Sequence, residues 1–429
     1  MKRVAVVAPE GLDFTAGQTR AAALATRILY TGGILVIRGY AGTGKSVLLA
    51  AIVESLLDSG QRADEDFVVA CPTGRAAARL RELGVRCART IHSFLYVPVV
   101  DRLGNLMGFR LRTIEDLPAR FALLLDESSM ISPAVLSDLY DLVTPTLGQR
   151  SIVAIGDSFQ LPPVLSAAEK EKYGAESIFD EDLMDQLSAE RCSLTEVVRQ
   201  QAGSPIIALA TALRSSTAPP PADWQKVTIV RDNRDKAEDW MRVPDFQVLT
   251  WRNQDRHELN TAARKQRDYS PARPFEPGER LVVTHNHREA NLCNGDLVDL
   301  LGLGSAQRWH SGTTYAATIR SPLDTAAQEC SLLLQTAEQQ QDGLSWPARA
   351  QKIKRESGVL PILVDYGYAL TCHKAQGSEW PTVGVYAPDT LLRVMDETEA
   401  HRWLYTAVTR AKDRLFFVGG GELAALLGG

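Results

Sequence analysis

Long apolar runs are missing from this sequence of 429 residues. No apolar run in it approaches the roughly 18 residues that a membrane-spanning helix needs. Residues 1–9 are basic and then apolar, as in a leader, but their apolar part is too short for a convincing signal peptide. The two absences together favour a chain that folds in water.

Cysteine is scarce, and neither charge sign dominates. The six cysteines are scattered without a C-x-x-C pair, so we expect reduced, mostly buried thiols in a cytosolic-type compartment. The net charge of −5 argues against a protein that is basic over its whole surface, although a single basic groove remains compatible with it. The chain is long enough for roughly two to four domains with ample cores.

A phosphate-loop pattern, G-x-x-x-x-G-K-[ST], occupies residues 39–46. An apolar run at 34–37 predicts a buried strand before it, and 47–57 has helical spacing, whereas a chance glycine-rich turn would need neither. This context predicts a strand–loop–helix unit that binds nucleotide phosphates, because inward-turned N–H groups and the helix dipole favour phosphate. Lys45 would reach the β- and γ-phosphates, and Ser46 would ligate Mg²⁺. The residues expected at the nucleotide are Gly39, Gly42, Thr43, Gly44, Lys45 and Ser46.

Two adjacent acids end the apolar run at 121–125. We expect Asp126 to hold the Mg²⁺ shell and Glu127 to polarise the attacking water as the general base. A strand-end Asp-Glu pair is common by itself. Its position after a phosphate loop makes it a more specific signal of nucleotide hydrolysis.

Three other side chains are candidates for contact with the nucleotide. Gln18 precedes the phosphate loop, where its amide could recognise an adenine edge, although a solvated helix glutamine fits equally well. Gln160 could sense the γ-phosphate by hydrogen bonding, and the double proline at 162–163 stiffens the segment that follows it. Arg199 is a candidate phosphate ligand.

Three further strands are predicted, at 67–71, 151–155 and 246–250, and the first of them runs into Pro72-Thr73-Gly74. A strand end with Thr and Gly, followed by Arg75, can hold a nucleic-acid phosphate. A simple turn between a strand and a helix explains the same residues. His92, which follows Thr90, could contact a backbone phosphate or pack in the interior.

Residues 94–120 change character and predict a small β-hairpin between two core elements. Apolar runs at 97–100 and 107–111 flank a polar turn. Met107 and Phe109, near the tip, could press apolar surface against a base pair and act as a strand-separation wedge. A packed surface ribbon explains the pattern equally well.

In their order along the chain, these stretches resemble the motifs of superfamily 1 DNA helicases. The resemblance is strongest to the 1B branch, which includes phage Dda and the RecD-like helicases, and it extends from residue 15 to residue 418. Each motif is short, but chance does not explain eight motifs in the family's order. The matching stretches are 39–46, 71–74, 90–94, 126–130, 156–164, 194–200, 368–380 and 404–412.

The resemblance implies an α/β protein with two RecA-like lobes, each a parallel sheet flanked by helices, and with ATP in the cleft between them. It also implies a β-hairpin insertion in the first lobe and an SH3-like β-barrel insertion in the second. Arg199 and Arg410 match the family's second-lobe arginines at the γ-phosphate, and Glu379 matches a glutamate near the ribose. The expected limits are 1–93 and 121–193 for lobe one, 94–120 for the hairpin, 194–274 and 362–429 for lobe two, and 275–361 for the barrel.

By the same resemblance, single-stranded DNA crosses both lobes and is held by phosphate contacts and aromatic stacking. Trp251 is the candidate stacking residue, although a packed tryptophan at a strand end fits equally well. The implied partners are single-stranded DNA and its junctions with duplex, with replication or recombination proteins as further candidates. A monomer suffices for two lobes that share one ATP. The residues expected to contact DNA are Pro72, Thr73, Gly74, Thr90, His92, Thr250, Trp251, Asn253, Thr371, His373 and Lys374.

Within the expected barrel, residues 278–361 begin as short strands that alternate with turns. The segments Thr325–Gln341 and Pro347–Glu356 instead favour helices. His285 and His287 have the spacing of a metal pair, but no third ligand lies nearby in the sequence, so exposed loop histidines are expected.

Three functions fit these motifs. The first, from the resemblance, is an ATP-dependent helicase that moves 5′ to 3′ on single-stranded DNA and separates duplex; its direction comes from the 1B branch alone. The second is a DNA-stimulated ATPase that remodels protein–DNA complexes without processive unwinding. The third is a small-molecule kinase, which would share the phosphate loop but would need neither Arg199 nor the motif at 371–380.

Overall fold

The computed structural model divides into two compact units. Unit 1 comprises Met1–Ala222 and Glu397–Thr409, and unit 2 comprises Asp223–Asp396 and Arg410–Gly429. In the part of the chain that is described, no helix is long and apolar enough to cross a membrane. The structure describes residues 4–100, 106–143, 150–173, 177–179, 181–186, 188–198, 203–215, 227–231, 246–270, 272–287, 289–321, 326–335 and 345–426.

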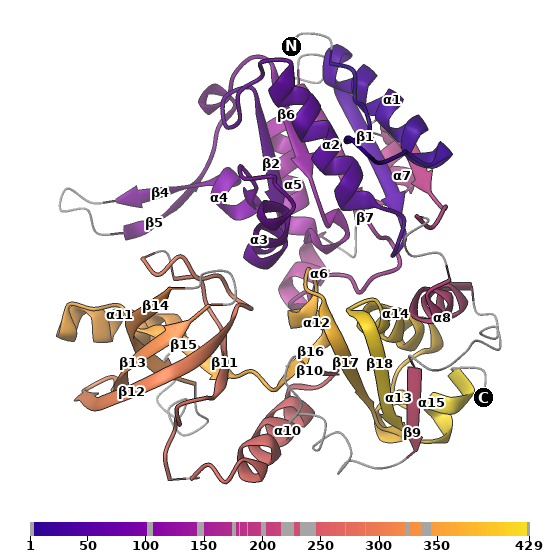
Figure 1. The fold of residues 1–429 in the computed structure, drawn as a ribbon. Coiled ribbons are helices and arrows are strands. Elements are labelled where there is room, and N and C mark those ends of the chain that lie inside the picture. The colour runs from indigo at the N-terminus through magenta and orange to yellow at the C-terminus, as the bar shows by residue number, and fades with distance from the viewer. Residues whose placement is uncertain are drawn as a thin grey trace. The chain divides into compact units, whose positions relative to one another are not determined.

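Unit 1 is built on a six-stranded parallel sheet with helices on both faces (Figure 1). In spatial order the strands are β3 (Arg89–Thr90), β2 (Phe67–Cys71), β6 (Phe121–Leu125), β7 (Arg150–Gly156), β1 (Gly33–Gly39) and β8 (Glu190–Leu194). The helices are α1 (Ala16–Thr31), α2 (Lys45–Asp58), α3 (Gly74–Glu82), α4 (Ile91–Leu95), α5 (Pro133–Val143), α6 (Ala167–Tyr173), α7 (Glu181–Gln186), α8 (Pro205–Ser215) and α14 (Glu397–Val408), with 3₁₀ turns η1 (Ile114–Asp116) and η2 (Ser128–Met130).

Alternation along β1 sends its side chains into two separate cores. Leu35 and Ile37 pack in one core with residues of α1 and α2, whereas Ile34 and Val36 pack in the other with residues of α5. A strand that is covered on both faces needs apolar residues at every position. This requirement explains the continuous apolar runs from which the strands were predicted.

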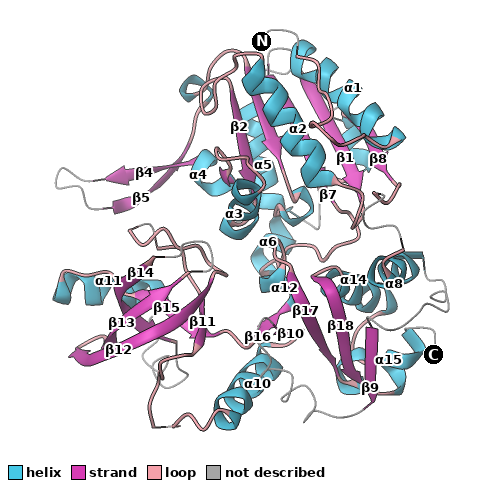
Figure 2. Ribbon diagram, viewed as in Figure 1, coloured by secondary structure: helices cyan, strands magenta, loops and turns pink. Residues whose placement is uncertain are grey.

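A two-stranded antiparallel hairpin extends from unit 1 after α4 (Figure 2). Its strands are β4 (Tyr96–Val100) and β5 (Leu106–Leu111), so the predicted hairpin is confirmed. The buried Arg150 holds the segment that follows β5, because its guanidinium donates to the carbonyls of Ile114 and Pro118 at 3.1 Å each. Burial lowers the pKa of this guanidinium.

Unit 2 contains a second parallel sheet. In spatial order its strands are β16 (Ala369–Thr371), β10 (Phe246–Thr250), β17 (Trp380–Ala387), β18 (Ala411–Gly419) and β9 (Val227–Arg231). The strand predicted at 246–250 has these bounds. The helices outside the barrel insertion are α10 (Asn253–Gln266), α12 (Cys372–Ala375), α13 (Asp389–Leu392) and α15 (Gly421–Leu426).

A closed five-stranded barrel is inserted between α10 and β16 (Figure 1). Its interior contains the fully buried Phe275, Leu281, Val298 and Leu332. Helix α11 (Trp346–Ser357) confirms the helix predicted at Pro347–Glu356. The strands are β11 (Arg280–Val283), β12 (Leu297–Trp309), β13 (Gly312–Arg320), β14 (Ala327–Leu334) and β15 (Ile362–Tyr366).

The helix predicted at Thr325–Gln341 is wrong where the structure describes this segment. Residues Ala327–Leu334 form β14, which pairs antiparallel with β13 and parallel with β15. Leu332 lies in the barrel core, while Leu333 packs on the other face with Trp346 of α11. Burial on both faces outweighs the weak helix preference of these side chains.

The limits of the barrel and of the two units also differ from those expected for the barrel and the lobes. Strand β15 closes the barrel but begins at Ile362, beyond the expected end at residue 361. Helices α8 and α14 belong to unit 1, although both fall in segments expected for lobe two. They contact each other, and α14 is hydrogen-bonded to the loop after β7, so tertiary contacts override sequence order.

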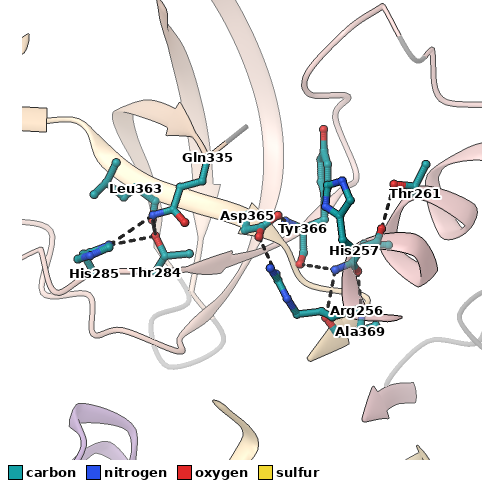
Figure 3. Close-up of polar contacts among 11 residues, drawn as sticks. Arg256, His257, Thr261, Thr284, His285, Gln335, Leu363, Asp365, Tyr366 and Ala369 are labelled. Atoms are coloured by element: carbon teal, nitrogen blue, oxygen red, sulfur yellow. Dashed lines mark hydrogen bonds and ion pairs between the residues drawn. The ribbon is translucent and has the colours of Figure 1, made fainter. Parts of the chain in front are cut away.

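Helix α10 fastens the barrel to the sheet of unit 2. The buried Asn260 amide donates to the carbonyls of Tyr366 and Ala369 at 3.1 Å and accepts the Ala369 N–H at 2.8 Å. Arg256 Nη1 lies 2.6 Å from Asp365 Oδ2 (Figure 3). A second buried pair joins α10 to the residue before β11: Arg264 Nε lies 2.5 Å from Glu279 Oε1.

We predict that Glu279→Gln lowers the free energy of unfolding by about 3 kcal/mol, because it leaves the buried Arg264 guanidinium without a charge partner. Urea titration monitored by tryptophan fluorescence measures the change. The matched control is Arg320→Gln, which breaks the 3.7 Å pair with Asp299 on the barrel surface, where both side chains are about half exposed. That change should cost less than about 1 kcal/mol; equal losses in the two variants would contradict the buried-pair interpretation.

Candidate active site

The phosphate loop joins β1 to α2 at the carboxyl edge of the unit 1 sheet. Gly42 and Gly44 have φ angles of +78° and +74°, in the region that favours glycine. A Cβ on Gly39 would lie 2.8 Å from both the Lys45 Cγ and the Thr43 Oγ1, and one on Gly44 would collide with the Gln18 amide. The turn therefore needs glycine where the pattern has it.

The Lys45 ammonium lies over this loop. Its Nζ donates to the carbonyls of Gly39 and Tyr40 at 2.7 and 3.1 Å and lies 3.9 Å from Oδ2 of the buried Asp157. Nucleotide phosphates would take the place of these carbonyls as acceptors, because charged acceptors make the stronger hydrogen bonds. Ser46 follows, half-buried, in the first turn of α2.

Gln18 is only 3% exposed, which excludes the solvated glutamine considered above. Its Oε1 accepts the Thr15 N–H at 2.9 Å, as part of a capping box at the start of α1. Its Nε2 donates to the Thr43 carbonyl at 3.2 Å. The amide thus ties α1 to the phosphate loop, while contact with adenine remains a prediction.

The segment after β8 is also tied to the phosphate loop. The Val198 N–H donates to the Gly42 carbonyl at 2.9 Å. The Glu196 carboxylate accepts the Gly17 N–H at 3.0 Å, and this hydrogen bond lowers the pKa of Glu196. Arg199, which follows Val198, lies outside the described residues.

Asp126 and Glu127 follow β6, two strands away from β1. Burial, together with the charge of Glu127, raises the pKa of Asp126 to about 7. Glu127 adopts a left-handed backbone with φ of +48°, which turns the chain directly after the strand. A bound divalent cation would offset the burial of Asp126 and keep its carboxylate ionised.

Four buried polar atoms near the ends of β6 and β7 have no hydrogen-bond partner among the residues that the structure describes. They are Glu127 Oε2, Ser128 Oγ, Ser129 Oγ and Gln160 Oε1. Such atoms are nearly always bonded in native proteins, so this cluster indicates a site that a polar ligand completes. The residues fit Mg²⁺ and a nucleotide, because Ser46 and Asp126 supply oxygen ligands. The acceptors Glu127 Oε2 and Gln160 Oε1 suit bound water.

The sequence analysis assigned no role to two buried residues at this site, Asp157 and Tyr405. The Tyr405 hydroxyl donates to Asp157 Oδ2 at 2.6 Å and accepts the Ala41 N–H at 2.8 Å. Its neighbour Thr406 accepts the Leu161 N–H at 3.0 Å. Both residues lie in stretches that match the helicase family, 156–164 and 404–412, but nothing in the sequence indicated that their side chains meet at the phosphate loop.

In unit 1, the residues predicted to contact DNA end two neighbouring strands. Cys71 and Thr90 are partners in the register of β2 and β3. The Thr73 hydroxyl accepts the Ala76 N–H at 3.1 Å, and the Thr90 hydroxyl accepts the Ser93 N–H at 3.2 Å, so both threonines cap helices. His92 is exposed rather than packed. Pro72, Thr73, Gly74, Thr90 and His92 therefore lie at one edge.

Unit 2 has the corresponding arrangement. Thr250 and Thr371 are register partners in β10 and β16, and the buried Thr250 Oγ1 has no hydrogen-bond partner in the described part of the chain. The Trp251 and His373 rings lie 5.1 Å apart, between centroids. Burial, then the charge of Arg256, lowers the pKa of Lys374. With Asn253 at the start of α10, these predicted residues share one edge.

Two predicted nucleotide contacts also lie in unit 2. Arg410 is buried, and its Nη1 donates to the Ser378 carbonyl at 3.2 Å. The Glu379 carboxylate lies 3.9 Å from the Lys412 ammonium. The roles of Arg410 and Glu379 stay predictions from the resemblance.

The hairpin keeps its predicted apolar surface in part. Phe109 is 55% exposed and lies opposite Pro98, so the packed ribbon does not account for this side chain. The side chain of Met107 lies outside the described residues. An exposed aromatic ring on a projecting ribbon suits contact with a partner.

The histidine pair has no features of a metal site. His287 is buried rather than exposed as predicted, and its Nε2 lies 3.0 Å from the Leu360 carbonyl. His285 lies 3.3 Å from the Thr284 hydroxyl (Figure 3). Within the described ranges, no group of three or more His, Cys, Asp or Glu side chains could hold a metal ion. The six cysteines are free, and three of them are buried.

Comparison with known proteins adds a family to this geometry. A family model described as an AAA domain matches residues 14–233, more than half of the chain. The chain belongs to this family. A model described as a UvrD-like helicase C-terminal domain matches residues 366–418. The two matches include the phosphate loop, both strand-end acids and Arg410, and they support the resemblance to superfamily 1B helicases of the Dda and RecD-like branch.

Individual relatives agree. The ATP-dependent RecD2 DNA helicase of Deinococcus radiodurans is 28% identical over 408 residues, 90% of this chain and 47% of that protein. The ATP-dependent DNA helicase Dda of Enterobacteria phage T4 is 33% identical over 181 residues, 42% of this chain and 38% of that protein. The chain thus spans about half or less of these two relatives.

A solved structure shows the same fold. Pif1 helicase from Bacteroides, in complex with ADP-AlF3 and single-stranded DNA, matches with a TM-score of 0.60 at 15% identity, over 97% of this chain and 94% of that one. The likeness confirms the predicted fold class: two RecA-like lobes, with a hairpin insertion in the first and an SH3-like barrel in the second.

We predict that Glu127→Gln lowers ATP turnover by about a hundredfold or more, because the amide cannot accept a proton from water. Nucleotide binding should persist, since the phosphate loop is unchanged. Steady-state hydrolysis and binding of a fluorescent ATP analogue measure the two effects. Glu54→Gln, an exposed acid on α2, is the matched control; substantial turnover by Glu127→Gln would exclude Glu127 as the general base.

Proposed function

We propose that this chain is an ATP-dependent DNA helicase that moves 5′ to 3′ along single-stranded DNA and separates duplex. The observation that carries this function is the cluster of buried oxygens after β6 and β7 that lack a hydrogen-bond partner among the described residues, because it suits a water-activating site. The printed names of the RecD2 and Dda relatives support it. Their sources favour action in the cytoplasm of a bacterium or of a phage host.

Each nucleotide contact has a chemical role in this proposal. Lys45 donates to the β- and γ-phosphate oxygens, Glu127 accepts a proton from the attacking water, and Gln160 orients that water. Mg²⁺, held by Ser46 and Asp126, would neutralise phosphate charge. Stabilisation of the transferring phosphoryl group is assigned to Arg199 and Arg410, and the ribose contact to Glu379.

Single-stranded DNA is the proposed partner of the two sheet edges that carry predicted DNA contacts, with Thr73 and Thr90 in unit 1 and Thr250 and Thr371 in unit 2. Short helices begin at the strand ends in both units, and their N–H groups favour phosphate. Trp251 is the proposed stacking residue, since bases of any sequence present a flat face. A small-molecule kinase would not need the edge in unit 2 with Thr250, Thr371 and Lys374, so this arrangement favours a nucleic-acid motor.

Duplexes of one sequence that carry either a 5′ or a 3′ single-stranded tail test the function. We expect ATP-dependent opening of the 5′-tailed duplex only, and no opening by Lys45→Ala, which should still bind single-stranded DNA. Opening of the 3′-tailed duplex alone would reverse the direction. DNA-stimulated hydrolysis without opening of either would favour the remodeller, and hydrolysis that needs a small acceptor would favour the kinase.

The hairpin has its own test. Replacing Met107 and Phe109 together by Ala should abolish strand separation while DNA-stimulated hydrolysis stays within about twofold of the wild type, because the ATP site is untouched. Leu83→Ala, an exposed apolar residue elsewhere in unit 1, is the control. If unwinding and hydrolysis fall together, the hairpin is not a wedge.

A further inference from the structure

A closed set of polar contacts links the phosphate loop to α14. The Tyr405 side chain, 1% exposed, accepts the Ala41 N–H and donates to Asp157 Oδ2 at 2.6 Å. The same Oδ2 lies 3.9 Å from the Lys45 ammonium, and Oδ1 accepts the Phe159 N–H at 3.1 Å. The set therefore begins and ends on the loop that would hold the phosphates.

We propose that Tyr405 is a positioning residue for the nucleotide: its hydroxyl satisfies the Asp157 carboxylate and so leaves Lys45 free to bind phosphate. This inference rests on the proposed function, since it concerns ATP at the same loop. It adds a residue from α14, far along the chain, to the machinery of nucleotide binding.

The charge environment of Asp157 explains the need for this hydroxyl. Asp157 has no exposed surface, and a buried carboxylate is costly unless donors surround it. In the described part of the chain, the donors at hydrogen-bond distance from its carboxylate are the Phe159 N–H and the Tyr405 hydroxyl. Lys45 at 3.9 Å is the cation placed to take over if the hydroxyl is lost.

Competition for Lys45 follows directly. At present its Nζ donates to two neutral carbonyls, which phosphate oxygens can replace easily. Without the Tyr405 hydroxyl, the Asp157 carboxylate would draw Lys45 from its present 3.9 Å to hydrogen-bond distance, in a close buried ion pair. The incoming phosphates would then have to break that pair.

The hydroxyl is suited to donate rather than to ionise. Burial, followed by the charge of Asp157, raises the pKa of Tyr405 well above its usual value, so the proton stays on the phenol. Helix α14 is also held by the Thr406 contact to Leu161. Loss of a single oxygen from Tyr405 should therefore leave the helix in place.

A double-mutant cycle on ATP affinity tests the inference. Binding of a fluorescent ATP analogue with Mg²⁺ is measured for the wild type, Tyr405→Phe, Asp157→Asn and the double variant. We expect Tyr405→Phe to raise Kd about tenfold, the usual effect of a hydrogen bond to a charged group, with kcat at saturating ATP changed less than twofold. Asp157→Asn should bind at least as tightly as the wild type, because a neutral amide does not hold Lys45.

The cycle separates positioning from structural damage. In the Asp157→Asn background, Tyr405→Phe should change Kd by less than about twofold, whereas a purely structural effect would persist there. Ser151→Ala removes another buried hydroxyl of unit 1, bonded to the Ile28 carbonyl, and should leave Kd unchanged. Equal Kd for Tyr405→Phe and the wild type, or equal losses in both backgrounds, would overturn the inference. Failure of the wild type to bind ATP would instead overturn the proposed function.

Discussion

Parallel strands end at one edge of a sheet, and this constraint gathers the candidate chemistry of unit 1. Strand β1 delivers the phosphate loop, β6 delivers Asp126, and β7 delivers Asp157. Strands β2 and β3, farther along the same edge, deliver Thr73 and Thr90. Strand order alone therefore places the predicted nucleotide contacts in the middle of the sheet and the threonines to one side. Any change in that order would separate them.

Charge balance at this edge depends on one lysine among three acids. Burial raises the pKa of Asp126, whereas Asp157 accepts two hydrogen bonds and one Glu127 oxygen has no partner among the described residues. In the proposed function each acid therefore has a different neighbour: a cation for Asp126, a hydroxyl for Asp157 and a water molecule for Glu127. Lys45 can serve only one acceptor set at a time, so the donors around the acids decide where it goes.

The sequence was sufficient where a pattern maps onto one local requirement. The strands at 67–71 and 246–250 were predicted with their observed bounds, because strands buried on both faces need unbroken apolar runs. Strand β14 was mistaken for a helix, since it also pairs in parallel with β15, which lies much farther along the chain. Tyr405 was missed for a similar reason: its partners, Ala41 and Asp157, lie far away in sequence, and no spacing rule links them.

The hydrogen bonds of Asn260 to Tyr366 and Ala369 bear on how the barrel insertion can vary between related proteins. Asn260 lies in α10, the helix that precedes the barrel, and its buried amide holds Tyr366, where the barrel ends, and Ala369, where the sheet resumes. The chain therefore leaves the sheet and returns to it at neighbouring points. A module attached at two adjacent points imposes no strain on the sheet that carries it. We therefore expect that the barrel can be lengthened, exchanged or removed while the strand order of the unit 2 sheet stays intact.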